Sequence, residues 1–188
     1  AMLDTHFRMH DDIAALVNPF YGGMLRSGCP RQQEKSLLPR LHFVPSAYEP
    51  VFKRHQGEAA RVAELLEEIK RRYGKKFTAD TVGVVTPWRA QIGVIKSAID
   101  DAEILEKVTI DTVQGGEKDI MIVSMAVFNS SQMALLESVD ANGEVDRKLN
   151  VTLSRAREEL ILLGYEPALM ASPFYARVLD AIRSPEEY

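Results

Sequence analysis

The sequence has very few cysteine and tryptophan residues: Cys29 and Trp88 are the only ones among 188. A single cysteine cannot form an internal disulfide, and it excludes a metal site built on cysteine pairs. No apolar run reaches the roughly 18 residues that a membrane-spanning helix requires, and the N-terminus has no signal-peptide pattern. These absences favour an intracellular protein with no membrane segment.

An excess of positive charge is also absent, since 23 Lys and Arg residues stand against 27 Asp and Glu residues. Net charge does not describe a single face, so nucleic-acid binding would have to use a local basic patch. No Gly-x-x-x-x-Gly-Lys-Ser/Thr phosphate loop occurs, and no acidic magnesium motif follows an upstream strand. A nucleotide site in this chain would therefore take its phosphate cradle and its magnesium ligands from another domain.

Apolar runs of strand length alternate with amphipathic segments along the chain. The runs predict strands at 41–44, 82–86, 108–110, 120–127 and 160–163. The amphipathic segments predict helices from 11 or 12 to before Pro19, at 57–73, after Pro87, and from Pro173 with Ser172 as its N-cap. Residues 129–148 are polar and predict an exposed insertion. The alternation predicts an α/β domain with one mainly parallel sheet and helices on both faces.

One stretch, Val151–Gly164, combines cations with a buried strand. Its first half is typical of a short helix carrying Arg155 and Arg157, and its second half is the apolar strand. A cation fixed on a helix just before a buried strand suits an anion at the edge of a sheet. The alternative is a solvated face, the usual role of an Arg-rich helix.

Two further segments carry residue types suited to a nucleotide or a base. An irregular stretch holds Phe7 beside Arg8, which could clamp a base and a phosphate; alternatively Phe7 is core and Arg8 a surface charge. A turn after the strand at 82–86 holds Trp88 and Arg89, where open α/β sheets bind ligands. Trp88 could stack on a base, or it could simply be packed.

A third segment, Gly115–Glu117, lies between two predicted strands. Paired glycines let the backbone approach a ligand closely, and exposed amides there can bind phosphate. Glu117 could accept hydrogen bonds from ribose hydroxyls. The alternative is a tight turn between strands with Glu117 solvated.

Four stretches stand in a fixed order: Leu-Asp-Thr-His-Phe-Arg-Met-His (3–10), Val-Val-Thr-Pro-Trp-Arg-Ala-Gln (84–91), Asp-Thr-Val-Gln-Gly-Gly-Glu-Lys-Asp (111–119) and Leu-Asn-Val-Thr-Leu-Ser-Arg-Ala-Arg (149–157). Together they resemble motifs IIIa, IV, V and VI of the second RecA-like domain of superfamily 1 helicases. The branch is the one with the nonsense-mediated-decay RNA helicases and the DNA helicase-nucleases.

This resemblance implies a RecA-like three-layer fold that lacks its own phosphate loop and helps to bind ATP between two domains. It implies that Phe7 stacks on adenine and that Arg8 reaches the γ-phosphate. It also implies that Gly115 lies at the nucleotide, that Glu117 holds the ribose, and that Arg155 is the arginine finger.

The resemblance further implies that Gln114 links the ATP site to nucleic acid, and that Thr86, Trp88 and Thr112 meet single-stranded DNA or RNA. ATP and Mg would be held mainly by an N-terminal RecA-like domain of the same polypeptide. We therefore expect residues 1–188 to be one domain of a larger protein, inactive by itself. A non-catalytic helicase-like module that binds nucleic acid or protein is the alternative.

Overall fold

The computed structural model describes residues 5–6, 9–18, 26–27, 40–112, 115–137 and 151–183. The strands are β1 (Thr5–His6), β2 (Arg26–Ser27), β3 (Leu41–Pro45), β4 (Val82–Val85), β5 (Thr109–Asp111), β6 (Lys118–Ser124) and β7 (Ala156–Gly164). The helices are α1 (Asp11–Val17), α2 (Gln56–Tyr73), the 3-10 turn η3 (Gly74–Lys76), α3 (Arg89–Ala98), α4 (Ala102–Lys107), α5 (Ser130–Leu136), α7 (Glu166–Leu169) and α8 (Pro173–Arg183).

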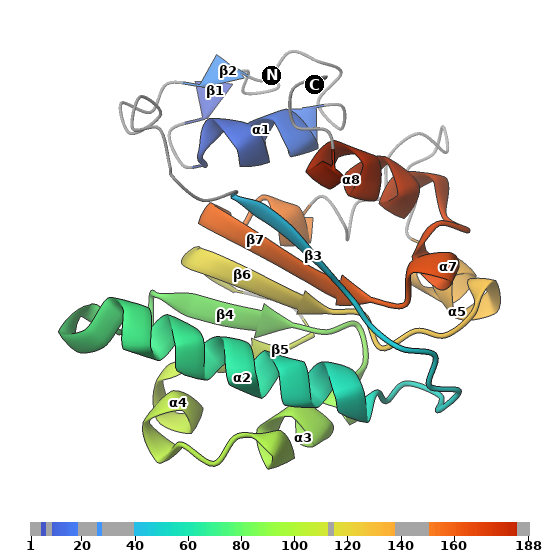
Figure 1. The fold of residues 1–188 in the computed structure, drawn as a ribbon. Helices are drawn as coiled ribbons and strands as arrows, with labels where there is room; N and C mark the ends of the chain where they lie inside the picture. Colours follow the sequence, from blue (N-terminus) through green and yellow to red (C-terminus); the bar gives the residue numbers. More distant parts are fainter. Residues whose placement is uncertain are drawn as a thin grey trace.

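Within these residues, five strands form one sheet in the order β3-β7-β6-β4-β5. Every neighbouring pair is parallel, as the sequence predicts. Figure 1 shows that the strands all point the same way, so their first residues share one edge and their last residues the other. We call these the amino edge, on the left of Figure 1, and the carboxyl edge, on the right. Strands β1 and β2 form a separate parallel pair.

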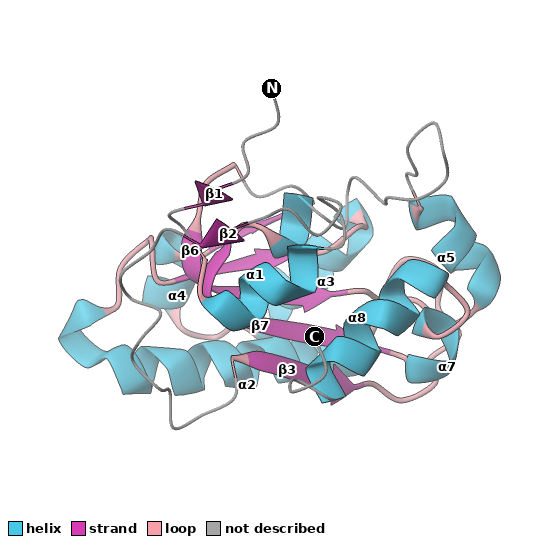
Figure 2. Ribbon diagram, turned by 90° about the horizontal axis from the view of Figure 1, so that it is seen from above, coloured by secondary structure: helices cyan, strands magenta, loops and turns pink. Residues whose placement is uncertain are grey.

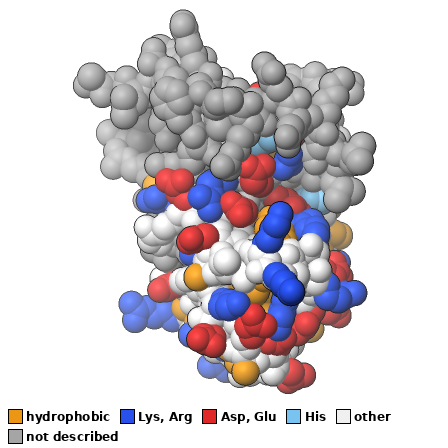
Figure 3. Space-filling view, turned by 90° about the vertical axis from the view of Figure 1, so that its left-hand side faces the viewer, with side chains coloured by type: hydrophobic (Ala, Val, Ile, Leu, Met, Phe, Trp, Pro, Cys, Tyr) orange, Lys and Arg blue, Asp and Glu red, His pale blue; other side chains and the backbone are white. Residues whose placement is uncertain are grey.

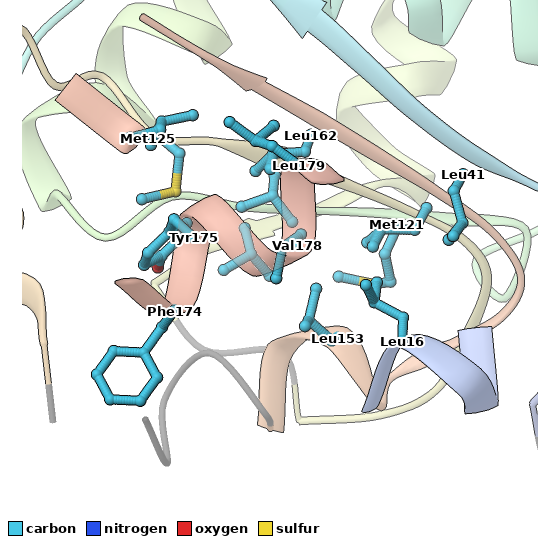
Figure 4. Packing of buried hydrophobic residues seen from close by; sticks show 14 of the residues in the cluster. Leu16, Leu41, Met121, Met125, Leu153, Leu162, Phe174, Tyr175, Val178 and Leu179 are labelled. Carbon is cyan, nitrogen blue, oxygen red and sulfur yellow. The ribbon is translucent and has the colours of Figure 1, made fainter. Parts of the chain in front are cut away.

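Helices cover both faces of the sheet, with α2, α3 and α4 on one side and α1 and α8 on the other (Figures 1 and 2). Side chains alternate between the faces along each strand, because successive residues of a strand point to opposite sides. In β6, Ile120 and Ile122 pack toward α2, whereas Met121 and Val123 pack toward α8. Figure 4 shows the core on the face covered by α1 and α8, which contains Leu16, Leu153 and Val178 together with Met121 and Leu162 of the sheet. The expected three-layer α/β architecture is confirmed.

The long helix predicted at 57–73 is also confirmed as α2, which begins one residue earlier, at Gln56. His55 caps it, because the His55 Nδ1 accepts a hydrogen bond from the Glu58 N–H at 2.9 Å. The helix ends at Gly74, whose φ of 53° lies in a region that residues with a side chain rarely adopt. Sequence patterns missed α4, which begins after Asp101; that carboxylate accepts from the amides of Glu103 and Ile104.

Three predictions need correction. Neither Arg155 nor Arg157 lies on a helix, because the helical residues end at 153. Arg155 lies in the turn that follows, and Arg157 lies in β7, which begins at Ala156 and pairs there with Lys118. The polar stretch 129–148 is not simply an exposed insertion, because α5 buries Met133; residues 138–150 lie outside the described part. Ser172 precedes α8, but its buried hydroxyl has no hydrogen-bond partner among the described residues, so it does not cap the helix.

No helix in the described ranges is both long enough and apolar enough to cross a membrane.

Candidate functional site

Segments from three of the motifs meet at the amino edge, where β6 and β7 begin. The amide of Lys118, which follows Glu117, donates to the Arg155 carbonyl at 3.1 Å. The amide of His10 donates to the Arg157 carbonyl at 2.7 Å. Backbone hydrogen bonds therefore bring together the chain around Glu117, the start of β7 and the segment two residues after Arg8.

The two arginines at this edge have different surroundings. The Arg157 guanidinium lies 3.0 Å from the Asp119 carboxylate and is held there. In contrast, the Arg155 side chain makes no hydrogen bond or ion pair with any residue that the structure describes, and its Nε atom is buried without a partner. The Arg155 amide donates to the Thr152 carbonyl at 3.3 Å, which fixes the turn. The fold thus holds the backbone of Arg155 in place, and no described residue neutralises its charge.

Most other charges near the amino edge are paired. Arg72 lies 2.9 Å from Glu159, and Lys118 lies 3.8 Å from Asp80. Burial acts to raise the pKa of Glu159, but hydrogen bonding by His42 and the charge of Arg72 outweigh it and lower that pKa. Figure 3 looks onto this side and shows Lys and Arg side chains mixed with Asp and Glu. Arg155, which has no ion-pair partner in the described part of the chain, therefore contrasts with the largely neutralised charges around it.

The glycine turn before β6 borders open space. Gly115 and Gly116 are exposed, and a Cβ atom added to either one would meet no other heavy atom within 4 Å. Glu117 is half-buried at the end of this turn. The segment that holds this open glycine turn is hydrogen-bonded to Arg155, whose side chain has no partner among the described residues. This combination fits a phosphorylated ligand, because glycine turns and guanidinium groups both favour bound anions. Phe7, Arg8 and Gln114 lie outside the described residues, so their placement is not part of this geometry.

The residues expected to meet nucleic acid lie at the opposite, carboxyl edge. Thr86 is 0% exposed, and its buried hydroxyl has no hydrogen-bond partner within the described ranges. Its amide donates to the Asp111 carbonyl at 3.1 Å, which joins the end of β4 to the end of β5. Thr112 is half-buried, and its amide donates to the Asp111 carboxylate at 2.6 Å. A contact between the Thr86 hydroxyl and a nucleic acid does not fit this burial.

Trp88 is 8% exposed, and its Nε1–H donates to the Met125 carbonyl at 3.0 Å. Its ring also lies 6.0 Å from the Phe52 ring, centroid to centroid. The Trp88 indole is therefore packed, which is the second of the two possibilities that the sequence left open, and it is not a freely exposed stacking surface. Phe52 and Tyr48, which the sequence analysis did not single out, are the exposed rings here. Two aromatic residues in a short irregular loop were the signal for them.

A buried carboxylate organises the same edge and was also missed. Glu58 is 1% exposed and accepts hydrogen bonds from Ser46 Oγ at 2.9 Å, Ser124 Oγ at 2.7 Å and Ala126 N at 2.9 Å. Burial raises the pKa of Glu58 despite these bonds. The available signal was spacing: Glu58 stands four residues before Val62, on the apolar face of α2.

Gln91 extends this network to the loop that precedes α2. Its Oε1 accepts from the His55 amide at 2.8 Å, and its Nε2 donates to the His55 carbonyl at 3.0 Å. Gln91 and Glu58 both contact Ser124 at the end of β6. Buried polar groups with their partners in place hold loops rigidly. The carboxyl edge is therefore a fixed surface.

Comparison with known proteins agrees with this architecture. The family model described as "AAA domain" matches residues 1–167. The mouse 5'-3' DNA helicase ZGRF1 is 26% identical over 199 residues, which cover 99% of this chain and 10% of that protein. The DNA polymerase alpha-associated DNA helicase A of Saccharomyces cerevisiae is 31% identical over 116 residues, 60% of this chain and 16% of that protein.

Among solved structures, the C-terminal domain of a possible DNA helicase from Lactobacillus plantarum superposes with a TM-score of 0.53 at 18% identity. The match covers 94% of this chain and 96% of that one, and at this identity it supports the fold alone. The chain spans only 10% and 16% of the two curated relatives, so their complete activities do not transfer directly. Because the family model covers most of its length, the chain belongs to the AAA domain family, as a RecA-like domain of the superfamily 1 helicase type.

Proposed function

We propose that this domain is the C-terminal motor half of an ATP-dependent superfamily 1 helicase. In this proposal Arg155 acts as an arginine finger at an ATP site shared with an N-terminal RecA-like domain. The observation that carries the proposal is the contrast at the amino edge, where Arg157 is paired with Asp119 and Arg155 has no counter-charge among the described residues. A guanidinium without an internal partner is available to an anion from outside the domain.

When bound, ATP supplies a γ-phosphoryl group whose transfer spreads negative charge over its oxygens. Arg155 has planar N–H donors suited to those oxygens, and its charge is permanent. Hydrogen bonds to Lys118 and Thr152 fix its backbone, so little reorganisation precedes the contact. Arg155 thus stabilises charge that is greatest in the transition state.

The remaining nucleotide contacts follow the motif assignment. Glu117 orients the ribose through its carboxylate, and Gly115 lets the backbone come close to the nucleotide. Phe7 stacks on adenine, and Arg8 adds a second cation at the γ-phosphate. Gln114 lies in the segment between β5 and β6, and we assign it the coupling of the two edges.

The phosphate cradle and the magnesium ligands belong to the N-terminal domain of the same polypeptide. In the described part of this chain, no three His, Cys, Asp or Glu side chains are grouped to hold a metal ion. We expect the domain alone not to hydrolyse ATP, because the sequence contains no phosphate loop. Single-stranded DNA or RNA is the partner at the carboxyl edge, beside Thr112 and the turn that holds Trp88.

Substitution of Arg155 tests the proposal in a protein that carries both RecA-like domains. Arg155→Ala should lower nucleic-acid-stimulated ATP hydrolysis by about 10³–10⁵-fold. The dissociation constant for ATP should change far less. Arg72→Ala is the matched control, since it removes an arginine near the same edge that is paired with Glu159. Turnover by Arg155→Ala at the level of the control would refute the arginine finger.

A non-catalytic binding module is the second candidate, and the exposed aromatic side chains of the carboxyl edge favour it. Such a module needs no unpaired Arg155. A two-domain protein that binds single strands without any ATP turnover would establish this candidate in place of the motor.

A further inference from the structure

Two large aromatic side chains remain exposed in the loop between β3 and α2. Tyr48 is 59% exposed and Phe52 is 54% exposed, with Val51 between them at 45%. This loop lies at the carboxyl edge, where the chain leaves β3 and turns into α2 (Figure 1). Apolar side chains gathered at one exposed place mark an interaction site more often than singly scattered ones do.

Both rings pack against aromatic residues of neighbouring segments. Tyr48 packs edge-on against Phe128, which follows β6, and tilted against Tyr165, which follows β7. Phe52 packs against Trp88, which follows β4. The ends of three strands thus support two rings that stay half exposed. Supported rings bind a flat ligand with little loss of side-chain freedom.

Cationic side chains accompany the rings. Lys53 Nζ lies 4.7 Å from the Phe52 centroid and 5.3 Å from the Trp88 centroid. Its φ of 63° lies in the left-handed region, which is unfavourable for a lysine. The exposed Arg54 and Arg89 flank the same segments. The nearby acid, Glu49, is engaged by the amides of Gln56 and Gly57 at the start of α2.

We propose that Tyr48, Phe52 and Lys53 form a base-stacking platform for single-stranded nucleic acid. Exposed rings offer faces to unpaired bases, and the neighbouring cations offer charge to phosphates; single-strand-binding surfaces combine these two elements. An acidic protein partner would use the cations but would not require flat rings whose position is fixed by packing against other rings. The inference rests on the proposed function, because it assigns residues to its nucleic-acid contact.

The test measures binding of dye-labelled 12-mers by fluorescence anisotropy, with the 188-residue chain and no nucleotide. The probes are oligo(dT), oligo(rU) and an abasic deoxyribose 12-mer with the same phosphates. Trp88, the only tryptophan, gives a second signal because it contacts Phe52. The chain should bind both base-containing strands at least about tenfold more tightly than the abasic strand, since stacking requires bases.

Variants assign the binding to the platform. Phe52→Ala should weaken oligo(dT) binding about 5- to 100-fold, and Phe52→Tyr should restore it. Lys53→Gln should reduce the slope of log affinity against log salt by about 0.7, the value for one phosphate contact on a single strand. Leu135→Ala removes a 64% exposed side chain of α5 and should change neither quantity. Circular dichroism checks that each variant is folded.

Three results would overturn the platform: no binding of oligo(dT), equal binding of the abasic strand, or Phe52→Ala indistinguishable from Leu135→Ala. Equal binding of the abasic strand would leave only an electrostatic contact. Because this assay contains no nucleotide, its failure is separate from that of the arginine finger, which turnover of Arg155→Ala reports.

Discussion

The two edges of the sheet differ in the kind of side chain that they leave available for contacts outside the domain. At the amino edge the backbone is tied together, yet the charge of Arg155 has no counter-charge among the described residues. At the carboxyl edge the polar groups are buried and paired around Glu58 and Gln91, whereas the apolar rings of Tyr48 and Phe52 are exposed. One edge leaves a cation available, and the other leaves aromatic surface available.

This difference teaches that the parallel sheet places the two proposed contacts, to the nucleotide and to the nucleic acid, at opposite edges. Each edge combines a fixed backbone with side chains that stay partly exposed or have no counter-charge among the described residues. Backbone hydrogen bonds between strand ends provide the frame at the amino edge. At the carboxyl edge a buried polar network provides the frame. Removing the acceptor at the centre of that network should therefore lower stability more than removing one of its donors.

The largest effect on stability should come from Glu58→Ala. The substitution removes the acceptor for Ser46, Ser124 and the Ala126 amide, so buried donors lose their partner. We expect the free energy of unfolding to fall by about 3 kcal/mol, measured by urea denaturation. Ser46→Ala removes one donor only and should cost about 1 kcal/mol. Equal costs for the two variants would show that Glu58 does not organise the edge.

A glycine at each edge offers a matched pair. At the carboxyl edge, a Cβ atom on Gly164 would lie 2.7 Å from Leu169 Cδ1 in the core, so Gly164→Ala should cost about 1–3 kcal/mol from overpacking. At the amino edge, Gly74 has space around it but a φ of 53°. Gly74→Ala should cost about 1–2 kcal/mol from backbone strain alone. Thermal unfolding measures both, and a neutral Gly164→Ala would contradict the tight packing.

Trp88→Phe tests whether the indole is structural. The change removes the donor to the Met125 carbonyl, which is buried beneath it. Stability should fall by about 1–2 kcal/mol, because a buried acceptor loses its hydrogen bond. Denaturation at several urea concentrations reports this loss. An unchanged midpoint would contradict a structural role for this hydrogen bond.

The smallest effect concerns pH. Burial raises the pKa of Glu58 above its ordinary value of 4.5, so the folded state keeps that proton to a higher pH than the unfolded state. Stability should therefore fall as pH rises from 4.5 through the folded-state pKa.

The pKa of Asp101 is lowered, chiefly by the Lys70 hydrogen bond, and the pKa of Glu103 is lowered, chiefly by the Lys107 hydrogen bond. Their stabilisation is lost as pH falls below the ordinary values of 3.8 and 4.5.

Glu58→Gln separates these contributions. The variant should lose the decline above pH 4.5 and keep the decline below it, as followed by the urea midpoint between pH 3 and 8. A wild-type decline above pH 4.5 that persists in Glu58→Gln would assign it to another group.

Much of the fold could be predicted from sequence, because the apolar period distinguishes strands from helices. The strand at 41–44 and the helix at 57–73 match β3 and α2 closely. Arg157 was misplaced because β7 begins four residues before its apolar part, where pairing with β6, a long-range effect, extends the strand. Asp101 and α4 were missed because a six-residue helix has too few positions to show a period.

For the candidate site, the sequence motifs indicate which segments are involved but not how their side chains are paired. Arg155 and Glu117 were placed by resemblance, and backbone pairing brings their segments together. Whether an arginine is paired depends on distant residues such as Asp119, which local sequence does not reveal. The same limit hid the burial of Thr86 and the packing of Trp88 against Phe52.

The most direct test of the account compares two nucleotide states in the two-domain protein. Arg155→Ala should bind the transition-state analogue ADP–aluminium fluoride at least about 100-fold more weakly, while its affinity for ADP stays within about threefold. This difference is expected because the guanidinium acts on charge that develops at the transferred phosphoryl group. Equal losses for the two ligands, or no loss for either, would contradict the assignment of Arg155 as the arginine finger.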